Sequence, residues 1–214
     1  MFFVGDKHMT ATMATTHDFG IDWAARLDVM LDDFVQTGVM VVDDCFDGDA
    51  VRALQAESGY IDYKDAHLTH GEREVSIRGD RIRWIDDACP VGLLYLSSIE
   101  SLAQYFNATL FAGIRRCEAH YACYPSGFGY QWHKDNPIGR DERVISAVYY
   151  LNDDWSQTDG GEIMVVDKLG NEQKLLPKAN RLVLFDSELL HQVNITNRTR
   201  FSIATWMRRD DDVL

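Results

Sequence analysis

The second half of this 214-residue chain contains eight short apolar segments, and clusters of turn-forming residues separate them. The segments have the lengths of β-strands and are rich in β-branched and aromatic residues, while the separators include Pro125-Ser126-Gly127 and Asp159-Gly160-Gly161. The predicted strands are Cys117–Tyr124, Tyr130–His133, Val144–Leu151, Gly161–Val166, Gln173–Leu176, Arg181–Phe185, His191–Val193 and Arg200–Met207. Many short strands with turn signals between them predict two packed sheets.

The first half of the chain has helical periodicity. Apolar positions recur at helical spacing from Ile21 onward until Thr37-Gly38 ends the helix, and Asp49 is predicted to be the N-cap of the next helix. The predicted elements are helices at 21–37, 49–59 and 90–107 and strands at 39–42 and 81–85. The expected fold is therefore mainly β with N-terminal helices: a double-stranded β-helix, or jelly roll, braced by about three helices.

The domain organisation is expected to be simple. Residues 1–20 show no clear period and are predicted to be a flexible lead, and residues 21–214 are predicted to form one domain. Residues 62–80 are polar and are expected to form a long mobile loop, because loops of this length tend to be functional or disordered.

Composition limits the function classes. The formal net charge of -13 opposes non-specific binding to nucleic acid or anionic lipid, so a protein or small-molecule substrate is favoured. No run of 18 apolar residues or signal-peptide core is present, and the four cysteines include no Cys-x-x-Cys pair. A monomeric cytoplasmic protein with free thiols is expected.

His133 and Asp135 stand two positions apart at the end of an apolar and aromatic segment. Side chains at this spacing on a strand point to one face, so both could reach the same ion. The pattern alone is weak, since about one such pair is expected by chance in a chain of this composition. The chain contains a second one, His70-Gly71-Glu72, in the polar loop, and a solvated surface histidine is expected there.

Two further residues strengthen the hypothesis of a metal site. His191 opens a later predicted strand and would complete a set of two histidines and one carboxylate, which on iron leaves the opposite face open. Arg200 lies nine residues further on, and an arginine that projects into a barrel needs a carboxylate partner. Two alternatives stay open at this point: unrelated half-buried histidines, and an outward-facing Arg200 paired with an acid.

Several sequence blocks occur in one order along the chain. The blocks are Ile77–Ile85, Ala122-Cys123-Tyr124-Pro125, Gly129-Tyr130, His133-Lys134-Asp135-Asn136-Pro137, Tyr149-Tyr150-Leu151-Asn152, Trp155, Gly160-Gly161, Pro177, Arg181-Leu182, His191-Gln192-Val193 and Arg200. In this order they resemble the catalytic domain of the prolyl hydroxylases that act on hypoxia-inducible factor, and the bacterial members are similar in size. The resemblance runs from about Val35 to Trp206.

The resemblance implies a dioxygenase that uses Fe(II), 2-oxoglutarate and O2, with ascorbate as reductant. By position, the implied iron ligands are His133, Asp135 and His191. The implied contacts to 2-oxoglutarate are Arg200 at its distal carboxylate, Tyr124, Tyr150 and, against its methylene groups, Ile163. Residues implied to lie near the target proline are Arg143, Trp206 and Tyr130, and residues 62–80 match a loop that closes over the peptide. One departure is Ala204, which stands where the family has a hydroxyl-bearing residue.

The implied reaction is hydroxylation of C4 of a prolyl residue in a protein, with release of succinate and CO2. Elongation factor Tu is the substrate toward which the bacterial resemblance points, and a role in oxygen sensing would follow from the family. Three alternatives remain: a hydroxylase of a free amino acid or another small molecule, a nucleic-acid demethylase, which the charge disfavours, and a cupin-like metal-binding sensor without turnover.

Overall fold

Two antiparallel sheets face one another in the computed structural model, which describes residues 18–66, 74, 76–136 and 139–210. The larger sheet has the order β1-β9-β6-β11-β4-β3-β2, and the smaller has the order β5-β10-β7-β8. Strands that are adjacent in a sheet are mostly distant in sequence, as in a jelly roll. The predicted fold class is thus confirmed.

The observed strands agree with the predicted ones to within about two residues. In the larger sheet they are β1 (Val39–Val42), β2 (Lys64–Asp65), β3 (Arg81–Trp84), β4 (Arg116–Tyr124), β6 (Arg143–Tyr150), β9 (Leu182–Asp186) and β11 (Arg200–Arg208). In the smaller sheet they are β5 (Tyr130–His133), β7 (Ile163–Val166), β8 (Glu172–Leu175) and β10 (His191–Val193). β2 falls inside the predicted loop at 62–80. His70 and the neighbouring residues 67–73 lie outside the described part of the chain.

The helices differ from the predicted ones at their ends. The predicted helix at 21–37 consists of α1 (Trp23–Leu27), a 3-10 turn (Asp28–Met30) and α2 (Leu31–Thr37). The turn has no fully buried side chain, and only Met30 packs against the core. Gly38 ends α2 in the left-handed conformation (φ +72°), as expected.

The predicted N-cap of the second helix is wrong by two residues. Asp47, rather than Asp49, caps α3 (Gly48–Tyr60), because its carboxylate accepts a hydrogen bond from the Ala50 amide. α4 (Pro90–Leu110) continues beyond the predicted end at Asn107, whose side-chain amide bonds both backbone groups of Ile114 after the helix.

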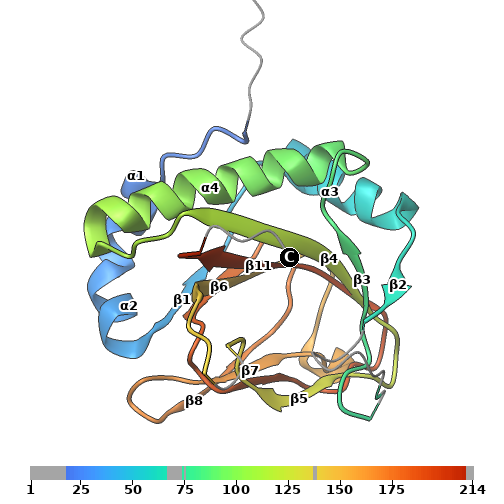
Figure 1. Ribbon diagram of the computed structural model, residues 1–214. Helices are drawn as coiled ribbons and strands as arrows, with labels where there is room; N and C mark the ends of the chain where they lie inside the picture. The colour runs from blue at the N-terminus through green and yellow to red at the C-terminus, as the bar shows by residue number, and fades with distance from the viewer. Residues whose placement is uncertain (1–17, 67–73, 75, 137–138, 211–214) are drawn as a thin grey trace, which may run out of the picture.

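The helices cover one face of the larger sheet, and the smaller sheet lies against its other face (Figure 1). The first interface is the main hydrophobic core, in which α4 packs on β4. Fully buried members of this core include Tyr95, Ile99, Leu102, Phe106, Tyr121, Tyr149, Ile203 and Met207. Side chains alternate between the two faces of a strand. The residues of the larger sheet that do not face the helices therefore face the smaller sheet and line the space between the sheets.

No helix among the described residues has the length and apolar composition needed to cross a membrane.

Glu57 of α3 ties the helical layer to the sheet. Its carboxylate accepts hydrogen bonds from the first free amides of α4, at Val91 (2.8 Å) and Gly92 (2.7 Å), and from the hydroxyl of Tyr121 on β4 (2.7 Å). One carboxylate thus satisfies donors from a helix N-terminus and from a buried strand.

Replacing Glu57 with Ala should lower the free energy of unfolding by about 1–3 kcal/mol, because these donors lose their acceptor. Urea denaturation measures the change. Glu57→Gln is the matched control: it keeps one acceptor oxygen and should lose less. Equal stability of the Ala variant and the wild type would show that water replaces the carboxylate without cost.

Candidate metal centre and cavity

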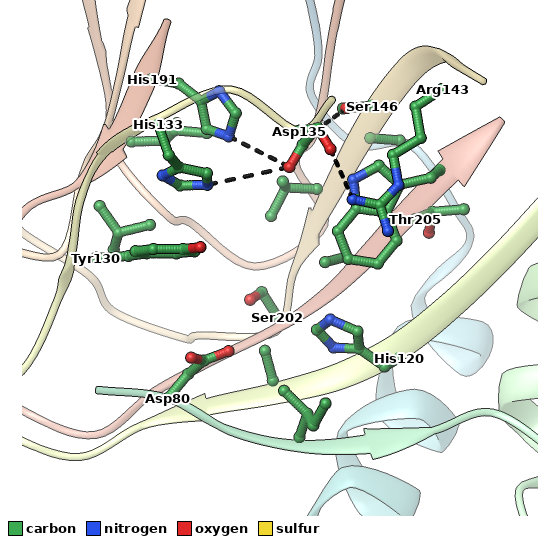
Figure 2. A pocket seen from close by; sticks show the side chains of 18 of the residues that line it. Asp80, His120, Tyr130, His133, Asp135, Arg143, Ser146, His191, Ser202 and Thr205 are labelled. Carbon is green, nitrogen blue, oxygen red and sulfur yellow. Dashed lines mark hydrogen bonds and ion pairs between the residues drawn. The ribbon is translucent and has the colours of Figure 1, made fainter. Parts of the chain in front are cut away.

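Three predicted ligands meet at one end of the smaller sheet. His133 ends β5 and His191 begins β10, and their Cα atoms are direct partners in the antiparallel pair. Asp135 Oδ1 lies 4.0 Å from Nε2 of His133 and 3.7 Å from Nε2 of His191. The three ligand atoms lie within 4.8 Å of one another and point to one common position (Figure 2).

The proximity of His133 and Asp135 was predicted, but the predicted cause, a shared face of one strand, is wrong. Strand β5 ends at His133, so Asp135 lies in the bend that follows and not on the same strand face. Asn136 closes this bend: its side-chain amide donates to the Arg143 carbonyl (2.9 Å) and accepts from the Arg143 amide (3.1 Å).

Both histidines present the same nitrogen to the common position. Nδ1 of His133 lies 2.7 Å from the carbonyl oxygen of Gln131, and Nδ1 of His191 lies 2.9 Å from that of Leu189. Because a carbonyl only accepts, each Nδ1 carries a proton, and Nε2 is the nitrogen that each ring turns toward the common position. Burial lowers the pKa of His133 to about 4, so this imidazole is neutral near pH 7.

Asp135 is held as a carboxylate by its surroundings. Burial by itself would raise its pKa, but His191, His133 and the hydroxyl of Ser146 together hold the pKa of Asp135 below its usual value. Two imidazole nitrogens and one carboxylate oxygen on one side of a site form the donor set that suits non-haem Fe(II).

Two serines that the sequence analysis did not predict support Asp135. Ser146 Oγ on β6 donates to Asp135 Oδ2 at 2.5 Å, and Ser146 and Ser187 are 2.8 Å apart, both fully buried. Since the one hydrogen of Ser146 goes to Asp135, Ser187 is the donor to Ser146. Ser146 shares the cavity-facing side of β6 with Val148, so strand alternation could have identified it; no sequence signal marks Ser187.

A cavity of about 750 Å³ extends from the three ligands across the larger sheet. Arg200 lies at one end, only 1% exposed, where Nε donates to the Gly161 carbonyl (2.9 Å) and Nη1 to Ser202 Oγ (3.1 Å). It makes no ion pair with any residue that the structure describes. The alternative of an outward-facing, acid-paired Arg200 is therefore excluded within these residues.

The surroundings of Arg200 fit a bound carboxylate. Its guanidinium carbon lies 5.0 Å from the ring centres of both Tyr124 and Tyr150. The Tyr150 hydroxyl is buried and has no hydrogen-bond partner among the described residues, so it is a donor without an acceptor. Ile163, 1% exposed, adds an apolar wall. A buried cation and a free donor beside an apolar wall suit a short dicarboxylate.

The remaining predicted residues lie toward the ligand end of the cavity. Arg143 stacks on Trp206 at 4.0 Å, donates to the Asp135 carbonyl (2.9 Å) and pairs with Glu118 (3.3 Å). Tyr130 stacks on the His133 ring, with centroids 3.6 Å apart. Nine of the ten predicted site residues thus line one cavity, and the tenth, Tyr150, packs against Arg200 at its wall.

Comparisons with known proteins agree with this geometry. A model of the 2OG-Fe(II) oxygenase superfamily matches residues 119–208. Egl nine homolog 1 of Homo sapiens is 36% identical over 189 residues, covering 79% of this chain and 43% of that protein. Prolyl hydroxylase EGLN3 of Homo sapiens is 32% identical over 176 residues, covering 78% and 73%. The chain spans about half the length of the Egl nine homolog 1 proteins that it matches.

Solved structures give the same result. A Pseudomonas putida prolyl-4-hydroxylase superposes with a TM-score of 0.76 at 35% identity, covering 85% of this chain and 98% of that one. A prolyl hydroxylase from Trichoplax adhaerens, in complex with a hypoxia-inducible-factor peptide fragment, superposes with a TM-score of 0.80 at 26% identity, covering 89% and 94%.

The jelly roll, the His–Asp–His cluster and the matched model together define an Fe(II)- and 2-oxoglutarate-type oxygenase fold. Within that superfamily, this chain belongs to the prolyl hydroxylase family.

Replacing Ser146 with Ala should weaken Mn(II) binding about tenfold to a hundredfold, because Asp135 loses the bond that orients it. Isothermal titration calorimetry on the purified protein measures the affinity without any turnover. Ser146→Thr keeps the hydroxyl and should bind Mn(II) nearly as tightly as the wild type, and Ser187→Ala should show a smaller loss. Unchanged affinity in Ser146→Ala would mean that the histidines alone position the carboxylate.

Proposed function

We propose that this protein is a prolyl 4-hydroxylase that acts on a protein substrate, uses Fe(II), 2-oxoglutarate and O2, and releases succinate and CO2. The observation that carries the proposal is the pairing, within one cavity, of the three-ligand cluster with a buried Arg200 that makes no ion pair in the described chain. A metal-binding sensor without turnover has no need of such a buried arginine.

Each residue has a definite part in this proposal. His133, Asp135 and His191 hold Fe(II) from one side, so the side of the iron that faces the cavity stays open to ligands. Arg200 pairs with the distal carboxylate of 2-oxoglutarate. The hydroxyls of Tyr124 and Tyr150 donate to the same molecule, and Ile163 packs on its methylene groups. When bound, iron and 2-oxoglutarate supply the oxidising chemistry that hydroxylates carbon, with ascorbate as the external reductant.

The protein contributes position and exclusion of water. Arg143 and Trp206 form a rigid stacked pair that orients the proline-bearing segment, and Tyr130 keeps the His133 ring in place. The expected closing loop includes residues 67–73 and 75, which lie outside the described part of the chain. Elongation factor Tu is the candidate protein substrate for this chain, whereas the Trichoplax relative is seen with a hypoxia-inducible-factor peptide.

The test is incubation of the protein with Fe(II), ascorbate, 2-oxoglutarate and purified elongation factor Tu, followed by mass spectrometry. Succinate release together with one added oxygen on a proline is the expected result, and His133→Ala should abolish both. Turnover on free proline but on no protein would establish the small-molecule alternative. No 2-oxoglutarate turnover with any substrate would leave the non-catalytic sensor.

Replacing Arg200 with Ala should weaken 2-oxoglutarate binding at least about tenfold, because a charge-assisted bidentate pair is lost. Mn(II) affinity should change by less than about threefold, since Arg200 lies at the other end of the cavity. Calorimetry with each ligand separates the two effects. Arg198→Ala, a surface arginine on the same segment, is the control and should change neither. Equal loss of the affinities for 2-oxoglutarate and for Mn(II) would show that Arg200 stabilises the folded site as a whole and does not bind 2-oxoglutarate directly.

A further inference from the structure

The cavity floor is built from cross-strand rows of side chains on the larger sheet. His120 of β4 is paired with Trp84 of β3 on one side and with Ala204 of β11 on the other, and Ala204 is paired with Val148 of β6. All four residues line the cavity. His120 is therefore the one side chain with a hydrogen-bond acceptor in this row, since the others carry an indole, a methyl group and an isopropyl group.

The His120 ring is fixed in orientation. It is 2% exposed and packs edge-on against Trp84 (ring centroids 5.1 Å apart) and tilted against Trp206 (5.3 Å). Its cross-strand neighbour Ala204 carries only a methyl group. Figure 2 shows His120 projecting into the cavity from the side opposite His133 and His191.

The tautomer of His120 follows from its one hydrogen bond. Nδ1 lies 3.2 Å from the carbonyl oxygen of Tyr121, which can only accept, so Nδ1 carries the hydrogen. Nε2 then keeps its lone pair, and it makes no hydrogen bond with any residue that the structure describes. Burial lowers the pKa of His120 to about 4, so the ring stays neutral near pH 7.

The unpartnered Nε2 of His120 determines which ligands can bind in this part of the cavity. A ligand that brings an N–H or O–H pairs with the nitrogen, while a ligand without a donor leaves it buried and unsatisfied. A prolyl residue inside a chain has no N–H of its own. The donor must therefore come from a residue next to the target proline.

We propose that Nε2 of His120 is a specificity element: it accepts a hydrogen bond from an N–H or O–H donor on a residue adjacent to the target proline. The proposal rests on the proposed prolyl hydroxylase function and names a chemical requirement for its substrate. Trp84 and Val148, on either side of this contact, receive apolar groups of the substrate. The next row of the sheet contains Trp206, on which Arg143 stacks.

The experiment uses a library of blocked synthetic peptides, each with a single proline and varied flanking residues, incubated with Fe(II), ascorbate and 2-oxoglutarate. The best peptide is then resynthesised with each flanking amide N–H methylated in turn and each flanking side-chain donor replaced by a methyl group. Wild type, His120→Gln, His120→Leu and His120→Met are compared. Gln keeps an acceptor near the position of Nε2, whereas Leu and Met fill the space without one.

The expected result is a KM for the best peptide that rises about tenfold in His120→Leu and His120→Met, with kcat changed less than about twofold. His120→Gln should stay within about threefold of the wild type. One donor-less peptide should lose the same factor with the wild type and nothing further with the Leu or Met variants. Affinities for Mn(II) and 2-oxoglutarate should match in all proteins, which shows that the folded site is intact.

Two results would overturn the assignment. An unchanged peptide KM in the Leu and Met variants would show that His120 only packs between Trp84 and Trp206. Additive losses from the variant and the donor-less peptide would show that the donor binds elsewhere. Failure of the proposed function has a different signature: the wild type would bind Mn(II) and 2-oxoglutarate and yet hydroxylate no peptide of the library.

Discussion

The site depends on the contacts of the Asp135 carboxylate, whose two oxygens have different partners. One oxygen faces the two histidines of the smaller sheet, and the other accepts the Ser146 hydroxyl from the larger sheet. A buried carboxylate is stable only when its oxygens are paired, and here the partners come from both layers. Asp135 therefore links the two histidines of the smaller sheet to β6 of the larger sheet.

Arg200 sets the opposite end of the cavity by the same physical rule. Its charge is buried among the rings of Tyr124 and Tyr150 and is met by hydrogen bonds to oxygen, but by no carboxylate of the described chain. Burying a guanidinium without an anion is costly, so the cavity is prepared for an anionic ligand there. Between the two ends lies the apolar row that contains His120.

Local sequence patterns predicted most of the framework and missed what depends on contacts between distant segments. The strands at 117–207 and the glycine stop at Gly38 were predicted because alternation and turn residues act locally. The N-cap was placed at Asp49 instead of Asp47 because both acids fit the pattern, and only the bond to the Ala50 amide distinguishes them. The division into a lead at 1–20 and one domain stays a prediction, since residues 1–17 are not described.

Short-range periodicity predicted the jelly roll, and recognisable sequence blocks predicted the three candidate metal ligands and Arg200, nine residues beyond His191. The tertiary structure alone decided three further things: that Asp135 is held by Ser146 and Ser187, that Arg200 points inward without an acidic partner, and that His120 keeps an unpaired nitrogen. Each depends on which distant strands pair and in what register, and no local pattern encodes that register.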